Sequence, residues 1–409
     1  MGLDKKKKNI LLVLDFLESG GATRINQELT RLYTDVDFGV LGAKLNGQSP
    51  PDEEFRVKRI FSYKIGNHSN FVVFALNIIK TFFHFGEVIR KFPIDTVVLN
   101  LPHSGLGVIL NPLSWKLKKI YLFHGSVDLE RKSLFDFNQP EDKKREQTFR
   151  NCLFRIKNRA EFIVQKQVMN TCDSVFVFSN YSRRLVRDHL GIDERKINKV
   201  PPPLSINKIF RRKISNVKKM RKEFNIGSSE TVFLVPSRME PRKGIHFLVD
   251  AVKLIREKGI YNFRVILSGL VYSDDYAYFL YEKCKNNSLY FNLNFIKRLE
   301  RKELYKLYGL VDCVVLPSAD LETFGLVTAE SFLFGTPVIG FDKGATSEII
   351  GKIDKRLLVD KVSAENLSNK MMWFMNLSPI DRRRIRRKSS PIIRKLLNRQ
   401  LLKSKLIFY

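Results

Sequence analysis

Short apolar runs recur along the chain, and segments with helical spacing separate them. In the C-terminal half the apolar runs cover residues 232–236, 263–268, 292–296, 311–316 and 338–341. The helical patterns between them cover residues 246–257, 276–285, 301–308 and 326–334. Brief, continuous apolar runs are typical of strands that are buried in a parallel sheet. The alternation therefore predicts a parallel α/β domain in this half.

The N-terminal half repeats this alternation. Strands are predicted at residues 9–16, 36–41, 96–101, 119–123 and 174–179, and helices at 24–33, 70–92, 149–169 and 182–190. A Val-Pro-Pro-Pro sequence at 200–203 and a basic stretch at 207–220 indicate a linker. We predict one domain at 1–203 and a second domain at 204–377. A basic helical tail at 378–409, which contains Pro391, is expected to cross back to the N-terminal domain.

Residues 316–341 form the most informative stretch. A strand ends in a loop that carries Glu322, and a helix that carries Glu330 then begins after Gly325. Gly335 ends that helix, and a strand follows it. The start of a helix binds anions through its backbone N–H groups, and carboxylates accept hydrogen bonds from hydroxyls. This pattern favours a ligand that is both phosphorylated and rich in hydroxyl groups.

A second cluster of polar residues follows the strand at 232–236. Arg238 and Lys243 lie five positions apart on a turn that contains Pro241 and Gly244. An arginine fork and a lysine point charge can together hold a diphosphate. In the N-terminal half, Gly20 and Gly21 follow the first strand, which is the arrangement of a Rossmann-like opening.

Two histidines that follow predicted strands of the N-terminal half are alternative candidates for a site residue. His124 follows the strand at 119–123, and His103 follows the strand at 96–101. Asp35 and Asp37 resemble a metal-binding DxD motif, but they lie inside a predicted strand near the N-terminus, and we expect no metal and no cofactor.

The formal net charge is +30 and the isoelectric point is near 9.9, which calls for a polyanionic partner. A nucleic acid, an anionic membrane leaflet and a phosphorylated substrate all satisfy that demand. About 44% of the residues are apolar, which excludes a disordered chain. The sequence has no recognisable secretory signal, so a cytoplasmic location is expected.

Taken together, these motifs resemble the family 4 (group 1) retaining glycosyltransferases. The resemblance rests on Arg238 with Lys243-Gly244, on Glu322 and Glu330 at their spacing, on the Gly20-Gly21 loop, and on His124-Gly125. It implies the GT-B fold, which consists of two facing Rossmann-like domains with parallel sheets and an interdomain cleft. It also implies that the substrate is a nucleotide-diphosphate-sugar, that the N-terminal domain at 1–203 binds the acceptor, and that the C-terminal domain at 204–377 binds the nucleotide-sugar.

The resemblance further implies a role for each motif. Arg238 and Lys243 would neutralise the leaving diphosphate, and Glu322 would hold hydroxyls of the donor sugar. The backbone amides of Phe324, Gly325 and Leu326 would cap phosphate or sugar oxygens, and Glu330 would hold the ribose. His124 would lie near the donor sugar and the acceptor, and the Gly20-Gly21 loop would approach the donor phosphate or the acceptor.

Several partners remain open at this stage. The basic segments contain interleaved apolar residues, which favours an anionic membrane surface and a lipid-linked, surface-polysaccharide or glycolipid acceptor at the cytoplasmic face. An enzyme that acts on a soluble acceptor and a nucleotide-sugar epimerase of the same fold are alternatives. A non-catalytic nucleic-acid-binding protein is disfavoured, because the basic segments lack an RNA- or DNA-binding motif and the glutamates would repel phosphate.

Overall fold

The computed structural model describes residues 8–17, 20–45, 55–65, 71–137, 144–204, 221–222, 226–227, 229–271, 273–296, 299–319 and 322–397. These residues form two compact units. The first unit contains the described parts of 1–128 and 143–205 together with Leu397, and the second contains those of 129–142 and 206–396. The predicted linker at 207–220 and the tail beyond Leu397 lie outside the described residues. The crossing of that tail to the N-terminal domain stays a prediction.

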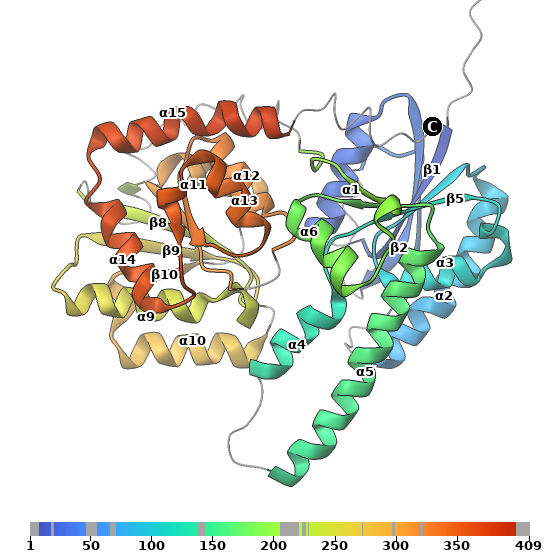
Figure 1. Ribbon diagram of the computed structural model, residues 1–409, viewed down its shortest axis with the longest axis horizontal. Helices are drawn as coiled ribbons and strands as arrows, with labels where there is room; N and C mark the ends of the chain where they lie inside the picture. The colour runs from blue at the N-terminus through green and yellow to red at the C-terminus, as the bar shows by residue number, and fades with distance from the viewer. Residues whose placement is uncertain are drawn as a thin grey trace, which may run out of the picture. The chain divides into compact units, whose positions relative to one another are not determined.

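A parallel sheet forms the centre of the first unit (Figure 1). It has seven strands in the order β3-β2-β1-β4-β5-β6-β7. Its strands are β1 (Lys8–Phe16), β2 (Val36–Leu45), β3 (Arg59–Ile65), β4 (Thr96–Leu99), β5 (Lys118–Leu122), β6 (Ser174–Val177) and β7 (Ile197–Lys199). In β1 every residue from Ile10 to Leu14 is buried, because side chains on both faces of the sheet are covered.

Helices α1 (Gly21–Leu32), α2 (Phe71–Lys91), α3 (Pro102–Leu110), α5 (Lys144–Thr171) and α6 (Asn180–Arg184) belong to the first unit. Helix α4 (Val127–Phe137) begins in the first unit and passes into the second at Leu129. The sequence predicted a turn where α3 lies. Gly107 explains why α3 forms there, since a side chain at this position would come within 2.5 Å of the Ile78 carbonyl oxygen on α2.

The second unit contains a six-stranded parallel sheet in the order β10-β9-β8-β11-β12-β13. Its strands are β8 (Thr231–Pro236), β9 (Phe263–Ser268), β10 (Leu293–Ile296), β11 (Cys313–Leu316), β12 (Val338–Phe341) and β13 (Leu358–Val359). The helices are α9 (Ile245–Glu257), α10 (Asp274–Asn286), α11 (Arg301–Leu310), α12 (Leu326–Leu333), α13 (Gly344–Ile353), α14 (Ala364–Met375) and α15 (Pro379–Leu396). Figure 1 shows these helices on both sides of the sheet.

Each sheet has a point where the strand order reverses. In the first unit it lies between β1 and β4, and in the second between β8 and β11. Loops that leave the carboxyl ends of such neighbouring strands diverge to opposite faces and leave room for a ligand. The predicted parallel α/β fold with two Rossmann-like units is thus confirmed. Among the described residues, no helix is both long and apolar enough to cross a membrane.

Candidate active site

Two loops meet at the carboxyl ends of β8 and β11 in the second unit. The loop after β8 makes a 3-10 turn at Pro241–Lys243 and ends at Gly244, whose φ of +64° is left-handed. A side chain on Gly244 would come within 1.9 Å of the Pro317 carbonyl oxygen. The backbone N–H of Ala319 also donates to the Arg242 carbonyl, at 3.2 Å. Glycine is therefore what allows the two loops to pack against each other.

The contact between these loops joins two of the predicted site residues. Lys243 Nζ donates a hydrogen bond to Glu322 Oε1, and Ser318 Oγ donates to the same oxygen at 3.3 Å. The side chains of Lys243 and Glu322 are only 13% and 22% exposed. Burial would raise the pKa of Glu322, but the charges of Lys243 and Arg242 outweigh it and lower that pKa. Glu322 is thus an ionised carboxylate that can only accept hydrogen bonds.

Arg238 belongs to a neighbouring charge network that the sequence did not reveal. Its guanidinium lies 3.1 Å from Glu240 Oε1, and Arg242 lies 2.9 Å from the same oxygen. Glu240 is buried and holds both arginines, while Arg238 stays 42% exposed. Burial and the nearby Arg242 lower the pKa of Lys243, and Glu322 opposes this shift. The loop thus gathers three cations beside two carboxylates.

The N-terminus of α12 lies directly after Glu322, Thr323 and Phe324. Gly325 caps the helix with a φ of +78°, and no side chain caps it. The buried hydroxyls of Thr328 and Thr346 adjoin Gly325 and have no hydrogen-bond partner within the described ranges. Buried hydroxyls are normally paired, so these two indicate a place where a ligand oxygen can bind. The amides of Phe324, Gly325 and Leu326 belong to this helix start.

Glu330 lies one turn further along α12 and is 1% exposed. The hydroxyl of Tyr305, on α11, donates to its Oε1 at 3.1 Å. The sequence predicted Glu330 but not Tyr305, since only the folded chain brings these positions together. A buried carboxylate needs hydrogen-bond donors, and ribose hydroxyls are donors of that kind.

The remaining predicted residues lie at strand ends of the first unit. Gly20 precedes α1 in an extended conformation, and a side chain there would meet nothing within 4 Å. His124 Nε2 lies 2.8 Å from Asn100 Oδ1, which also accepts from Asn26 Nδ2 at 2.7 Å. Asn26 Nδ2 donates in turn to the Ala22 carbonyl, at 2.8 Å. This network links His124 to the start of the helix that Gly20 and Gly21 open.

The protonation state of His124 follows from these contacts. Asn100 Nδ2 donates to the Val13 carbonyl at 3.0 Å, which fixes Oδ1 as the side facing His124. His124 therefore donates through Nε2–H. Burial lowers the pKa of His124 to about 3, so the ring is neutral at physiological pH. A neutral histidine here can orient a hydroxyl group but cannot act as a standing positive charge.

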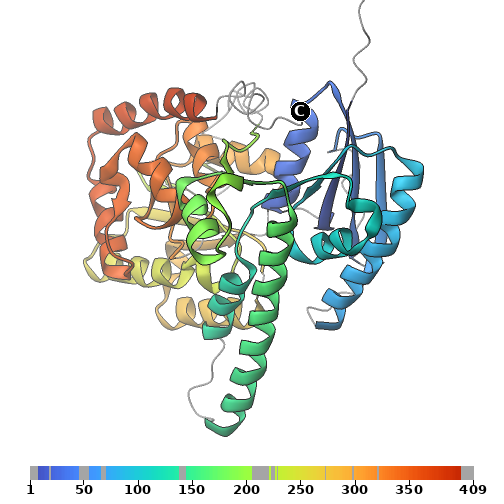
Figure 2. The ribbon, with the colours of Figure 1, turned by 45° about the vertical axis from the view of Figure 1, so that its right-hand side comes forward.

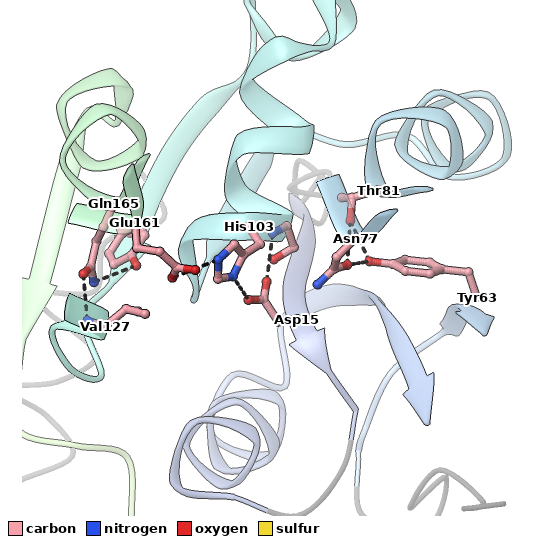
Figure 3. Close-up of polar contacts among 10 residues, drawn as sticks. Asp15, Tyr63, Asn77, Thr81, His103, Val127, Glu161 and Gln165 are labelled. Atoms are coloured by element: carbon pink, nitrogen blue, oxygen red, sulfur yellow. Dashed lines mark hydrogen bonds and ion pairs between the residues drawn. The ribbon is translucent and has the colours of Figure 1, made fainter. Parts of the chain in front are cut away.

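His103, the competing histidine, has a different environment. Its Nδ1 lies 3.0 Å from Asp15 Oδ2 and its Nε2 lies 3.1 Å from Glu161 Oε2 (Figure 3). Burial alone would lower the pKa of His103, but the hydrogen bonds to Asp15 and Glu161 raise it to about 9. Asp15 Oδ1 also accepts from the backbone N–H of Ser104 at the start of α3, at 2.8 Å. His103 is thus a buried cation that joins β1, α3 and α5.

The structure therefore distributes the predicted residues between the two units. Arg238, Lys243, Glu322, Glu330 and the α12 N-terminus lie in the second unit, and Gly20, Gly21 and His124 lie in the first. The roles expected of these residues stay predictions. Asp37, from the DxD-like sequence, forms an ion pair with Lys58 at 2.5 Å. In the part of the chain that the structure describes, no group of three or more His, Cys, Asp or Glu side chains could hold a metal ion.

Two Rossmann-like units, each with polar loops at a topological switch point, define a class of nucleotide-binding α/β proteins. A family model described as "Glycosyltransferase Family 4" matches residues 19–208, and one described as "Glycosyl transferases group 1" matches residues 216–390. The two matched segments follow one another in the sequence, and together they include residues of both units. The chain belongs to the family 4 and group 1 glycosyltransferases, and its fold is GT-B.

Curated relatives agree with this family. The chain is 24% identical to the D-inositol 3-phosphate glycosyltransferase of Corynebacterium glutamicum over 65% of its own length and 61% of that protein. It is 27% identical to the lipopolysaccharide 1,2-N-acetylglucosaminetransferase of Salmonella typhimurium over 37% of its length and 40% of that protein. It therefore matches less than two thirds of either relative.

The whole described fold also has a counterpart among solved structures. Anabaena HepE, in complex with UDP and glucose, superposes with a TM-score of 0.74 at 16% identity. The superposition covers 98% of each chain.

Proposed function

We propose that this protein is a retaining glycosyltransferase that moves a sugar from a nucleotide-diphosphate-sugar to an acceptor hydroxyl. The observation that carries the proposal is the Lys243–Glu322 contact, which joins a cation to a hydrogen-bond acceptor at the start of α12. Arg238 lies in the same loop as Lys243 and is exposed enough to meet a ligand. The cations can neutralise a diphosphate, and the carboxylate can accept hydrogen bonds from the hydroxyls of a sugar.

Donor binding would use each of these groups in turn. The diphosphate would contact Arg238, Lys243 and the amides of Phe324 to Leu326. The buried hydroxyls of Thr328 and Thr346 would each form a hydrogen bond to the bound ligand or to a water molecule that accompanies it. Glu322 would accept hydrogen bonds from sugar hydroxyls, and Glu330 would accept them from the ribose.

In the transfer step the acceptor oxygen forms a bond to the anomeric carbon as the bond from that carbon to the diphosphate breaks. The electron pair of the broken bond goes to the diphosphate, and the acceptor proton moves to a diphosphate oxygen. We propose attack on the same face as the leaving group, which retains the configuration. Negative charge builds on the leaving group, so Arg238 and Lys243 would lower the barrier without a metal ion.

The acceptor is proposed to be a lipid-linked, surface-polysaccharide or glycolipid precursor at the cytoplasmic membrane face. The charge of +30 and the lipopolysaccharide glycosyltransferase among the relatives support this choice. The inositol phosphate named for the Corynebacterium relative supports a soluble acceptor as the competing case.

A thermal-shift panel of UDP-, GDP- and ADP-sugars tests the donor part. A ligand at 100 times its Kd stabilises the native state by about 2.7 kcal/mol, so the true donor should raise the melting temperature clearly. Mass spectrometry of the product from a lipid-linked and a soluble acceptor then tests the transfer. Absence of any shift across the panel would contradict the proposal. A product whose sugar is epimerised but not transferred would favour an epimerase.

A further inference from the structure

Helix α5 presents an apolar stripe to solvent. Cys152, Leu153, Ile156 and Ile163 recur at helical spacing, with Ala160 completing the row, so they share one face of the helix. Leu153, Ile156 and Ile163 are 51%, 63% and 51% exposed. Isolated exposed apolar residues are normal on a protein surface, but a continuous row along one helix face indicates a binding surface. We refer to these five residues as the α5 stripe.

The opposite side of α5 anchors the helix to the first unit. Glu161 accepts from His103, and Gln165 pairs with the Gly125 carbonyl at 2.8 Å. Val168 and Met169 are fully buried in the core. All four anchoring residues belong to the C-terminal half of the helix. No residue from 151 to 160 is buried. Figures 1 and 2 both show the N-terminal half of α5 extending past the other helices of the first unit.

Cations flank the α5 stripe on both sides. Arg155 and Arg159 lie along one edge of the stripe at helical spacing, and Lys157 lies along the other. The segment 151–160 contains these three cations and no acidic residue. Lys157 also lies 5.6 Å above the ring of Phe74 on α2, which holds its stem against the unit. An aliphatic centre with basic edges is the composition of a helix that lies in the interface of an anionic bilayer.

We propose that the α5 stripe and its flanking cations dock on an anionic lipid surface. Two other occupants fit the surface less well. A nucleic acid would place its phosphates against the aliphatic centre, where nothing pairs with them. A second copy packed through the same stripe would bring the flanking cations of two helices together. The inference deepens the proposed function. It rests on that function only for the purpose of the docking, which is to bring the enzyme close to a membrane-borne acceptor.

Co-sedimentation with lipid vesicles tests the docking directly. The full chain is mixed with phosphatidylcholine vesicles or with vesicles that contain about 30% phosphatidylglycerol. We expect binding to the anionic vesicles only, and a loss of at least tenfold in partitioning for Leu153→Asp combined with Ile156→Asp. Arg155→Gln with Arg159→Gln should weaken binding to anionic vesicles severalfold and should make it less sensitive to salt.

A matched control separates this surface from a rival. Ile380 on α15 is 70% exposed and adjoins Arg383, Arg384 and Arg387, so α15 also combines an apolar residue with cations. Ile380→Asp should leave vesicle binding unchanged. Loss of binding in Ile380→Asp, with normal binding in the α5 double variant, would overturn the proposal. A wild-type dimer that the α5 double variant converts to monomer, without vesicle binding, would also overturn it.

The donor thermal shift distinguishes this inference from the proposed function. The α5 double variant should keep the wild-type melting temperature and the wild-type donor-induced shift, because the α5 stripe belongs to the first unit and the candidate donor-binding loops belong to the second. Vesicle binding without any donor shift would leave the docking intact and defeat the proposed function. A donor-induced shift and product formation without vesicle binding would support the proposed function and overturn the docking.

Discussion

The ammonium group of Lys243 donates a hydrogen bond to Oε1 of Glu322, although 79 positions separate the two residues in the chain. The contact spans two loops that leave neighbouring strands, β8 and β11. The charge of Lys243 helps to keep the Glu322 carboxylate ionised where both side chains are mostly shielded from water. In the proposed donor complex, the same two groups would turn to phosphate and sugar oxygens, so the pair would pre-orient the site.

We expect Lys243→Ala to lower the rate of sugar transfer by about 10² to 10³, since it removes one preorganised contact to the leaving group. Glu322→Ala should cause a loss of similar size through the donor sugar. Product formation measured by mass spectrometry checks both. Lys253→Ala is the control, because Lys253 forms an exposed ion pair with Glu257 on α9 and should keep full activity. Full activity in both site variants would refute the assignment.

Tyr305 and Glu330 make a separate prediction about the donor. Tyr305→Phe leaves the buried carboxylate with one donor fewer, which should cost about 1–3 kcal/mol of unfolding free energy. Glu330→Gln should raise the KM for the donor more than it lowers kcat, because a ribose contact is made equally in the ground and transition states. Tyr278→Phe, at an exposed tyrosine on α10, should be neutral in both assays. An unchanged donor KM in Glu330→Gln would argue against the ribose role.

The buried His103 predicts a dependence of stability on pH. Its pKa is raised in the folded state to about 9 from an ordinary 6.5, so its contribution is complete below pH 6.5 and is lost as the pH rises through 9. The shift corresponds to roughly 3 kcal/mol of unfolding free energy. Urea unfolding of the wild type and of His103→Gln at pH 6 and pH 9.5 measures it, and the variant should lose less stability between these values.

His124 supplies the control for that experiment. Burial lowers the pKa of His124 to about 3, so this ring is neutral in the folded state at both pH values. His124→Asn should therefore not lessen the loss of stability between pH 6 and pH 9.5, in contrast to His103→Gln. Its own pH effect has the opposite sign, since the contribution of a buried neutral ring is lost as the pH falls below 6.5. An equal loss of unfolding free energy between pH 6 and pH 9.5 in the wild type and in His103→Gln would contradict the assigned charge of His103.

Two glycines with left-handed backbone conformations isolate the contact between the site loops. Gly259→Ala should cost about 1–2 kcal/mol, because its φ is +75° and a side chain there meets nothing within 4 Å. Gly244→Ala has the same backbone cost, and its added side chain also forces the Pro317 carbonyl away from the loop after β8. It should therefore destabilise the protein further and reduce transfer. Urea unfolding and product assays of the two variants give the difference, and equal effects would contradict the role of Gly244.

Much of the second unit could be predicted from the sequence, and the reason is physical. Strands β9 and β12 begin and end where the apolar runs predicted, because nearly every residue in them is buried and apolar. Helix α3 could not be predicted in this way. Pro102, Gly105 and Gly107 are typical of a turn, yet Gly107 packs closely on α2 and Gly105 packs closely on Val168 of α5, which makes glycine favourable in this helix.

The site shows the same division. Arg238, Lys243, Glu322 and Glu330 could be recognised because each belongs to a local motif of fixed spacing. Their partners could not be recognised, because only the fold brings them together. Tyr305 is 25 positions from Glu330, and Asp15 is 88 positions from His103. Polar residues of that kind carry no local signal in the sequence.

The central claim is that the loops after β8 and β11 hold the diphosphate of a nucleotide-sugar. Calorimetric titration of the nucleoside diphosphate of the true donor into the wild type, Lys243→Ala and Lys253→Ala tests it most directly. A lost charge-assisted hydrogen bond of about 1.5–3 kcal/mol weakens affinity roughly 10- to 150-fold. The account predicts that loss for Lys243→Ala and wild-type affinity for Lys253→Ala. Equal affinity in all three proteins would contradict it.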